Sequence, residues 1–451
     1  MGNIYPRIGI GSIAAFLLHN GQEVQILDPE LTRLNLDQIK SEIRKVKPDL
    51  VGLPAYTEEI HQAANLAKAI KDVNPEIITV VGGPHASAEP VQVLTEFSSF
   101  DIAVYGEGEQ TMLDLTNERK TLDEIMGIAF RKGDELKLNR PRPLIKNFDT
   151  LPFPAWHLYE LDKYRGSSLY SGFKKRGKRL LELPIEGARG CPYSCIFCFR
   201  ATGRNVRFKS PSVIADEIER AVQKFQADAM YFVEGTFGIS KKYAIATCEE
   251  IVRRGLHEKI VWSCGARVDI DKELLIKMKE AGCIFIGFGV ESGDPGILKI
   301  IRKNVQPEQA IETFKTCKNI GIKTEANFIL GHPYETEEMI KKTINLAKKL
   351  NTDHANFAIL VPFPGTEVYG MACNNIGGLK IRTTDWRLYG KQLGSALELE
   401  QIPSHRLVQL QAKAYKEFYL RPGRFPSFIK ERMSPKLLFH SLKRVLGAYK
   451  R

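Results

Sequence analysis

Long apolar runs and a dense cysteine pattern are both missing from this sequence. No uninterrupted apolar stretch reaches the roughly 18 residues that a membrane-spanning helix requires, and the first residues show no signal-peptide pattern. Eight cysteines among 451 residues do not make the disulfide framework of a small secreted domain. These absences argue against an integral membrane protein and against a disulfide-stapled one, so we expect a soluble protein of a reducing cytoplasm.

A surplus of positive charge is also missing from most of the chain. The net charge is +12, from 65 basic and 53 acidic residues. Residues 421–451 contain nine Lys or Arg and one acid, so they supply +8 of this total. The rest of the chain is therefore nearly balanced, which argues against a general nucleic-acid-binding surface and indicates a basic C-terminal tail.

This tail has the pattern of an amphipathic helix. Ser434 and Pro435 read as an N-cap and a first-turn proline. One apolar stripe follows, with basic residues outside it: Leu438, Leu442, Val445, Leu446 and Tyr449. Such a helix either lies on an anionic membrane surface or packs on the rest of the protein. A second basic run, at 174–179, is either a solvated loop or a contact for an anionic substrate or partner.

The order of the apolar segments predicts an α/β protein with more than one domain, because 451 residues are too many for one ordinary domain. Residues 1–120 alternate between helices and strands, which favours a parallel sheet with crossover helices and a Rossmann-like domain. We expect helices at 13–18, 36–46 and 59–73, and strands at 23–28, 49–53, 77–81 and 101–105.

A connector is expected at 121–180, and a helical, basic extension at 391–451. Within the connector, residues 127–131 pair with residues 135–139 as a hairpin. Four prolines then favour extended chain, because each biases its predecessor away from the helical region: Pro141, Pro143, Pro152 and Pro154.

Residues 181–390 predict a partial, TIM-like (β/α)6 barrel. The strands are expected at 181–186, 229–233, 259–264, 283–290, 324–330 and 355–360, and the helices between them at 213–225, 242–254, 272–281, 307–320 and 337–350. Barrels of this type gather their chemistry at the carboxyl ends of the strands. Polar or glycine-rich residues follow all six strands, so the rule points to one site.

Three cysteines follow the first of these strands on one short loop. Cys191, Cys195 and Cys198 are separated by three and then two residues. Thiolates are soft ligands suited to zinc, copper(I) or iron–sulfur clusters. A four-iron cluster usually takes four cysteines, so three would leave one iron open to hold and activate a small molecule. The remaining cysteines have no close partners in the sequence, which makes a second cluster improbable.

The spacing Cys-x3-Cys-x2-Cys, with an aromatic residue before the last cysteine, resembles the signature of the radical S-adenosylmethionine (SAM) enzymes. The resemblance implies a [4Fe–4S] cluster held by Cys191, Cys195 and Cys198, whose fourth iron is chelated by SAM. It also implies reductive cleavage of SAM to methionine and a 5′-deoxyadenosyl radical.

The strand ends that follow are similar to those of the same family, and they imply residues around SAM. Glu234 stands where a short polar motif contacts the amino group, and Arg267 either holds the SAM carboxylate or makes a structural salt bridge. Glu291 would accept from the ribose hydroxyls, and it needs a partner if it is buried. The resemblance adds Phe197 and Gly331, the latter in a turn that lets backbone approach adenine.

Residues 1–120 resemble the cobalamin-binding domain found ahead of one branch of this family. The matching strand ends carry Thr57, Gly82, Gly83, His85, Gly106, Glu107 and Gly108, which the resemblance implies near cobalamin. Two departures matter: the first strand of such domains is missing, and the sequence contains no Asp-x-His-x-x-Gly motif. The alternative is a Rossmann-like domain that has kept the fold and lost cobalamin.

The resemblance implies an enzyme that modifies an unactivated carbon, by cobalamin-dependent methyl transfer as in B12-dependent radical SAM methyltransferases. Its relatives would include the anaerobic magnesium-protoporphyrin monomethyl ester cyclases. One alternative is a cyclase or rearrangement enzyme without functional cobalamin, and another is a non-catalytic iron–sulfur or zinc module. We expect a small-molecule substrate, with a lipid or tetrapyrrole among the candidates, an electron donor such as flavodoxin or ferredoxin, no nucleic acid, and peripheral membrane contact through the basic tail.

Overall fold

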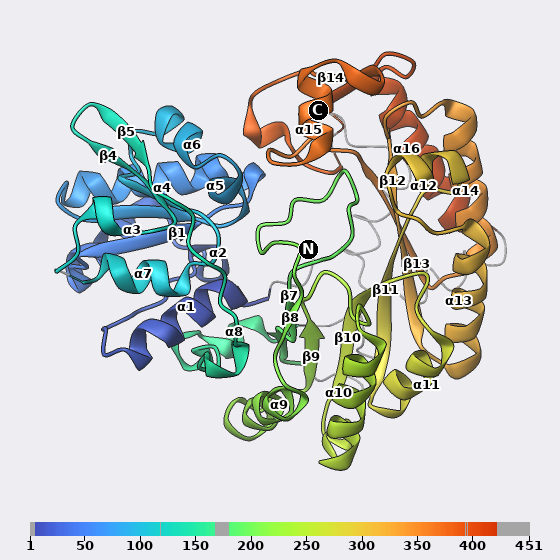
Figure 1. The fold of residues 1–451 in the computed structure, drawn as a ribbon, viewed down its shortest axis with the longest axis horizontal. Helices are drawn as coiled ribbons and strands as arrows, with labels where there is room; N and C mark the ends of the chain where they lie inside the picture. The colour runs from blue at the N-terminus through green and yellow to red at the C-terminus, as the bar shows by residue number, and fades with distance from the viewer. Residues whose placement is uncertain (1–4, 118, 167–179, 393, 395, 422–451) are drawn as a thin grey trace. The chain divides into compact units, whose positions relative to one another are not determined.

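The computed structural model describes residues 5–117, 119–166, 180–392, 394 and 396–421 (Figure 1). The chain divides into two compact units. Residues Asn3–Pro192 and Phe199–Met230 form what we call the N-terminal unit. The C-terminal unit contains Tyr193–Cys198 and Tyr231–Arg451. Each unit is described by itself.

The N-terminal unit is built on a five-stranded sheet in the order β1-β2-β3-β4-β5. Strands β1 (Leu50–Pro54), β2 (Ile78–Gly82) and β3 (Ile102–Val104) are parallel. The helices of this region are α1 (Ile8–His19), α2 (Pro29–Thr32), α3 (Leu36–Val46), α4 (Ile60–Val73), α5 (Pro84–Ala88), α6 (Pro90–Glu96) and α7 (Glu109–Leu115). The apolar strand residues Val80, Ile102 and Val104 pack with Leu17 of α1 in one core cluster. The predicted parallel sheet with crossover helices is confirmed.

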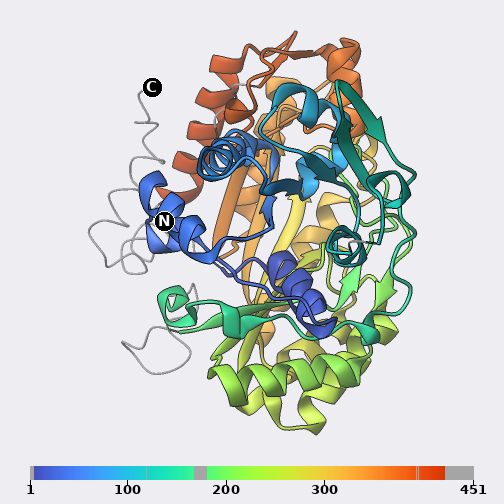
Figure 2. The ribbon, with the colours of Figure 1, turned by 90° about the vertical axis from the view of Figure 1, so that its left-hand side faces the viewer.

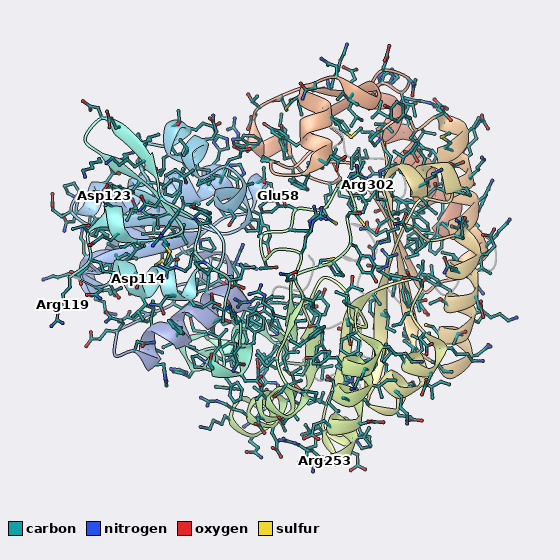
Figure 3. All side chains as sticks on the ribbon, in the orientation of Figure 1. Glu58, Asp114, Arg119, Asp123, Arg253 and Arg302 are labelled. Atoms are coloured by element: carbon teal, nitrogen blue, oxygen red, sulfur yellow. The ribbon has the colours of Figure 1, made fainter. Side chains whose placement is uncertain are left out.

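The predicted hairpin is present as β4 (Ile128–Lys132) and β5 (Glu135–Leu138), which pair antiparallel. Strand β4 also pairs antiparallel with β3, so the hairpin extends the N-terminal sheet. The chain that follows is held to α7, because Arg142 forms an ion pair with Asp114 of that helix. Asp114 is labelled in Figure 3. The predicted connector thus begins inside the sheet, and the domain boundaries stay predictions.

The strand expected at 23–28 is wrong. No described strand lies beside this segment, and a strand needs a hydrogen-bonded neighbour. Its alternating pattern has another cause, since Val24 and Ile26 pack against the cores around α1. Asp28 then caps α2 by accepting from the N–H of Leu31 at 3.0 Å. The described chain enters α1 at Ile8 without a strand before it.

The rest of the N-terminal unit leads from the sheet to the cysteine loop. Trp156 is buried and contacts Gly11 of α1, and the N–H of Ala155 donates to the Gly11 carbonyl at 3.0 Å. Helix α8 (Leu161–Tyr164) follows, then β6 (Glu182–Ile185) and the two-residue strands β7 (Ala188–Arg189) and β8 (Arg207–Phe208), which pair antiparallel. Helix α9 (Pro211–Phe225) ends in a left-handed C-cap.

The strands of the barrel follow the order β6-β9-β10-β11-β12-β13. In the C-terminal unit β10 (Val261–Arg267), β11 (Cys283–Glu291), β12 (Lys323–Leu330) and β13 (His354–Ile359) are parallel neighbours. Strand β9 is Ala229–Phe232, and the intervening helices are α10 (Lys241–Arg253), α11 (Lys272–Glu280), α12 (Pro295–Ile300), α13 (Pro307–Ile320) and α14 (Glu337–Leu350). All six strands lie where the sequence predicts them, which confirms the partial (β/α)6 barrel.

The edge strand β13 is covered by α16 (Ser404–Tyr419), which runs along it in both views (Figures 1 and 2). Its N–H groups at Ala355 and Phe357 donate to the hydroxyls of Tyr419 and Tyr415, each at 3.1 Å. The amide of Gln411 donates to the Phe357 carbonyl at 2.7 Å. Side chains of a helix thus replace the missing neighbouring strand.

Between β13 and α16 lie α15 (Glu367–Cys373), β14 (Leu379–Ile381) and β15 (Leu397–Leu399), the last two an antiparallel pair. The basic run at 174–179 and the amphipathic stripe after Pro435 lie outside the described residues. Within the described part of the chain, every helix is too short or too polar to cross a bilayer.

Gly190 follows β7 of the antiparallel pair β7–β8, and a substitution there tests how tightly this pair packs against the start of the cysteine loop. Its φ is +98°, and a Cβ there would overlap the carbonyl oxygen of Asn205. We expect Gly190→Ala to lower the free energy of unfolding in urea by about 2 kcal/mol or more. Gly133→Ala is the control, because Gly133 also has positive φ but open space around it, so only about 1 kcal/mol should be lost. Equal losses would contradict the role of the Asn205 contact.

Candidate functional site

The cysteine loop is closed at its base by the β7–β8 ribbon of the N-terminal unit. The N–H of Cys191 donates to the carbonyl of Gly203 at 3.2 Å, and the N–H of Gly190 donates to the Thr202 hydroxyl at 3.1 Å. Backbone bonds therefore fix Cys191 directly after the ribbon.

The later part of the loop, Tyr193–Cys198, belongs to the C-terminal unit and is held by the turn after α12. The N–H of Ile196 donates to the Ile301 carbonyl at 3.3 Å, and the Ile196 carbonyl accepts from Val368 at 3.2 Å. Cys195 is buried, with its Sγ 3.9 Å from the carbonyl oxygen of Arg302, whereas Cys198 is exposed. The loop thus presents one sheltered thiol and one accessible thiol.

The electrostatics of this thiol pair favour the ligand form. A hydrogen bond from Cys198 lowers the pKa of Cys195 to about 6 against the opposing effect of burial, and the charges of Lys303 and Arg267 lower it further. The same hydrogen bond raises the pKa of Cys198. The shift of Cys195 is toward the thiolate, which is the form that binds metals.

The donor set fits an iron–sulfur cluster that lacks one protein ligand. Three thiols on an eight-residue stretch are the soft ligands that iron–sulfur chemistry requires. The fit is one of ligand type: across the described residues no three His, Cys, Asp or Glu side chains, the three loop thiols included, are gathered closely enough to hold a metal ion. The four buried cysteines Cys248, Cys264, Cys283 and Cys317 lie in the barrel core and form no such group either.

Glu291 has the partner that its buried position demands. Its Oε1 lies 2.8 Å from Nζ of Lys303, and both side chains are buried. The ladder between β11 and β12 is irregular between Gly289 and Glu291, and Glu291 has φ +65°. A Cβ at position 289 would overlap the Glu291 carboxylate, so glycine leaves room for the ion pair. No motif singles out Lys303; only the need for a cation beside Glu291 could have indicated it.

Arg267 ends β10 and is already engaged. Its Nε donates to Oδ1 of Asp269 at 3.0 Å, and one terminal nitrogen donates to the Lys303 carbonyl at 2.7 Å. Its guanidinium lies 3.9 Å from the ring centre of Tyr193 in the cysteine loop. The structure thus contains the salt bridge of the alternative interpretation, and the SAM carboxylate contact stays a prediction.

The end of β12 brings Gly331 beside two residues that the sequence did not indicate. Glu335 accepts from the N–H groups of Gly331 and His332 at 2.6 and 3.0 Å. Burial raises the pKa of Glu335 to about 8. The His332 ring is fully buried, 6.1 Å from the ring of Phe197, and neither of its nitrogens has a hydrogen-bond partner. Glu234 follows β9 and is nearly buried.

Five of the residues expected near cobalamin lie at the carboxyl edge of the N-terminal sheet. Nδ1 of His85 lies 3.2 Å from Oγ1 of Thr57. Gly83 has φ +97°, and a Cβ there would be 2.9 Å from the Ala55 carbonyl oxygen. Nothing lies within 4 Å of a Cβ built on Gly82 or on Gly106. Close backbone approach with open space beside it fits a large planar ligand.

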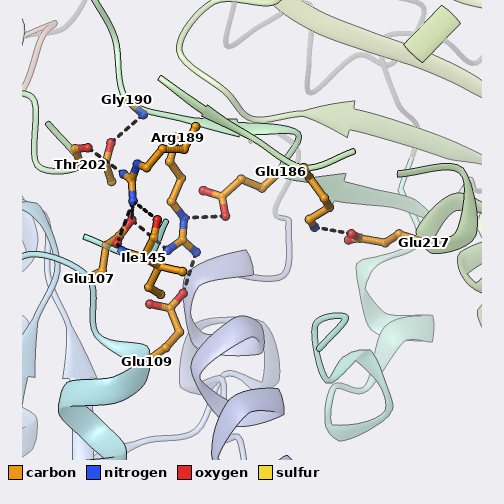
Figure 4. Close-up of polar contacts among 10 residues, drawn as sticks. Glu107, Glu109, Ile145, Glu186, Arg189, Gly190, Thr202 and Glu217 are labelled. Carbon is orange, nitrogen blue, oxygen red and sulfur yellow. Dashed lines mark hydrogen bonds and ion pairs between the residues drawn. The ribbon is translucent and has the colours of Figure 1, made fainter. Parts of the chain in front are cut away.

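Glu107, also expected near cobalamin, is bonded to protein groups instead. It accepts from one terminal nitrogen of Arg189 and one of Arg207, and from the N–H of Ile145 at 2.7 Å (Figure 4). Gly106 donates to the Ser87 hydroxyl at 3.2 Å, and Gly108 precedes α7. Cobalamin contact by the backbone of this loop stays a prediction, whereas the carboxylate of Glu107 is occupied by protein.

Comparison with known proteins gives concordant matches. Residues 185–347 match the radical SAM superfamily, and residues 1–116 match the B12 binding domain. The chain is 33% identical over 429 residues to an uncharacterized methyltransferase of Pyrococcus horikoshii, covering 94% of this chain and 89% of that protein. It is 30% identical over 456 residues to the anaerobic magnesium-protoporphyrin IX monomethyl ester cyclase of Rubrivivax gelatinosus, covering 98% and 79%.

The fold also has a solved counterpart. The radical SAM methyltransferase TsrM of Kitasatospora setae, solved with cobalamin and a [4Fe–4S] cluster, superposes with a TM-score of 0.70 at 19% identity over 86% of this chain and 81% of that one. Fold and cysteine loop together define an iron–sulfur enzyme that uses SAM.

The chain belongs to the radical SAM enzymes that carry a B12-binding domain. The resemblance that the sequence indicates is therefore confirmed. The cofactors of this family are a [4Fe–4S] cluster, SAM and cobalamin. A non-catalytic metal module is excluded as the main interpretation, because the chain matches enzymes over most of its length.

His85 makes the stability of the protein depend on pH. Burial lowers its pKa to about 4, with Glu96 opposing and His61 adding to the shift. Because the folded pKa lies below the ordinary 6.5, the free energy of unfolding is highest above pH 6.5 and falls as the pH drops toward 4, by about 3 kcal/mol from this group. Urea unfolding of His85→Asn should show a flatter profile in this window. Burial lowers the pKa of His332 to about 3 in both proteins, so it does not mask the difference; equal slopes would contradict the assignment.

Proposed function

We propose that the protein transfers a methyl group to an unactivated carbon of a small-molecule substrate. The observation that carries this proposal is the joint presence of a three-cysteine loop at the head of the barrel and a glycine-lined sheet edge in a B12-binding domain. A relative named as a methyltransferase, similar over 94% of the chain, supports it.

In this proposal Cys191, Cys195 and Cys198 hold the cluster and leave one iron for SAM. The bound cluster and SAM supply a 5′-deoxyadenosyl radical, and cobalamin supplies the means of carrying methyl. The protein's own contribution is to lower the pKa of Cys195 and to shelter this residue behind the turn at 301–303.

The proposed SAM contacts follow the strand ends. Glu234 would accept from the SAM amino group, Glu291 from the ribose hydroxyls, and the backbone at Gly331 would approach adenine beside Phe197. For the SAM carboxylate, the ion pair of Arg267 with Asp269 leaves fewer of its donors unused. Lys303 is a second candidate, because an ammonium has three donors and the contact with Glu291 uses one of them.

A second candidate function is oxidative ring closure without methyl transfer. The similarity to a magnesium-protoporphyrin ester cyclase over 98% of the chain favours it. The two functions differ in the fate of the SAM methyl group, which only the first delivers to the product. This difference makes them separable by isotope.

We also propose a compartment, an electron donor and a class of substrate. We propose a cytoplasmic enzyme, since an oxygen-sensitive cluster and free cysteines suit a reducing compartment. Flavodoxin or ferredoxin would supply electrons. Hydrophobic substrates such as lipids or tetrapyrroles are proposed because a basic amphipathic tail would bring the enzyme to the surfaces where they gather.

The reaction is tested by anaerobic reconstitution with iron, sulfide and hydroxocobalamin, followed by SAM labelled in its methyl group, dithionite and candidate lipids or tetrapyrroles. We expect 5′-deoxyadenosine, retained corrin absorbance and label in the product. Cys195→Ser should abolish 5′-deoxyadenosine, while Glu291→Gln should weaken SAM binding about tenfold, as expected when a charged hydrogen-bond acceptor is lost. Product without label would favour the cyclase, and no 5′-deoxyadenosine from the wild type would end both.

Membrane contact is tested with vesicles of anionic and of neutral lipid. The full chain should float with anionic vesicles at low salt, and a chain without residues 421–451 should not, because those residues carry +8 of the net charge. Equal flotation of the two chains would refute a role for the tail.

A further inference from the structure

Two arginines at the base of the cysteine loop hold the loop that follows β3. Arg189 donates to Oε1 of Glu109 at 2.6 Å and to Oε1 of Glu107 at 3.3 Å. Arg207, opposite it on β8, donates to both oxygens of Glu107 at 2.9 and 3.0 Å. We call these four side chains the ribbon clamp; all belong to the N-terminal unit (Figure 4).

The clamp is sealed from water on the side of the connector. The guanidinium carbons of Arg189 and Arg207 lie 4.8 and 5.1 Å from the ring centre of Phe148, which is buried. The Ile145 carbonyl accepts from Arg207 at 2.8 Å, and its N–H donates to Glu107. Charged groups in such a place interact strongly, because little water screens them.

The two arginines of the clamp serve more carboxylates than their own number. Arg189 also donates to Glu186 at 2.8 Å, so three carboxylates share two guanidiniums. Burial raises the pKa of Glu186. Neither arginine can leave without stranding a buried carboxylate, which ties the loop after β3 to the ribbon.

The segment between the clamp and the first cysteine is one closely packed residue long. Only Gly190 separates Arg189 from Cys191, and its left-handed conformation and its contact with Asn205 leave no room for a side chain. Cys191 itself is bonded to Gly203. A displacement of the ribbon is therefore passed to Cys191 rather than absorbed by a flexible joint.

At the other end, Glu107 stands between Gly106 and Gly108, in the loop that the proposed function assigns to cobalamin. We propose that the ribbon clamp couples the two cofactor sites: occupancy of the loop after β3 by cobalamin sets the position of Cys191 and thereby tightens SAM binding at the cluster. The proposal rests on the proposed function for the identity of the ligand at that loop. Arg189 and Arg207 act as positioning residues, since they act through Glu107 and Glu109 and through the ribbon.

A purely structural staple would behave differently. If the ion pairs only stabilised the fold, weakening them would lower the free energy of unfolding and the affinities for both ligands to a similar extent. It would leave unchanged the factor by which one ligand alters the affinity for the other. A coupling element changes that factor, which is reciprocal between the two sites.

The experiment measures this factor with the full chain, anaerobically reconstituted with its cluster and kept oxidised so that SAM is not cleaved. SAM is titrated calorimetrically with and without saturating hydroxocobalamin. In the wild type, we expect hydroxocobalamin to tighten SAM binding about fivefold or more. In Arg207→Gln the factor should fall below about twofold, and Arg207→Lys, which keeps the charge, should restore it above that level.

The matched control is Glu217→Gln. Glu217 is as buried as Glu107 and pairs at 2.6 Å with Lys209, one residue after β8, but it lies on α9. This variant should keep the wild-type factor. If Arg207→Gln does not fold, Glu109→Gln, which removes the negative charge from a single contact of Arg189, takes its place and should reduce the factor as well.

The outcomes separate the two proposals. Retained corrin without any effect on SAM affinity in the wild type overturns the coupling and leaves the proposed function standing. The coupling is also overturned if a folded clamp variant keeps the wild-type factor, or if Glu217→Gln loses as much of the factor as the clamp variant does. If the wild type retains no corrin at all, the cobalamin part of the proposed function fails, and the coupling fails with it.

Discussion

A charge withdrawn from water must meet an opposite charge, and this requirement shapes the surroundings of the cysteine loop. An unpaired buried ion costs several kcal/mol, so Glu291 and Glu107 are each matched with a cation brought from elsewhere in the chain. Lys303 is carried to Glu291 by the turn after α12. Arg189 and Arg207 bring the loop after β3 to the ribbon. Lys303, which pairs with Glu291, also lowers the pKa of Cys195, and so does Arg267, which pairs with Asp269.

Much of this protein can be predicted from its sequence because its strong signals are local. The six barrel strands are apolar runs with helices between them, and each lies where expected. The segment at 23–28 fails for a non-local reason, since alternation cannot say whether a neighbour exists to bond with. Lys303 and the partners of Glu107 escape prediction likewise, because ion pairs spanning 12 to 100 residues depend on the finished fold.

The backbone contributes to the site as much as the side chains do. Glu291 reaches Lys303 only because its own left-handed conformation redirects the end of β11 and because position 289 has no Cβ. Gly190 permits a turn between ribbon and cysteine that a larger residue would block. Strain of this kind persists where packing over-determines it. Glycines and left-handed residues at strand ends therefore mark the site together with the cysteines.

The tyrosines of α16 that bond to β13 also set an order of events when the chain is made. Strand β13 is complete about 45 residues before α16 begins. At roughly 5–20 residues per second, the ribosome leaves this edge unsealed for a few seconds. During that time the N–H groups of Ala355 and Phe357 lack the hydroxyls that later satisfy them. The edge at β13 is thus open to mispairing with other chains until α16 has been made, and α16 is the described helix that covers it.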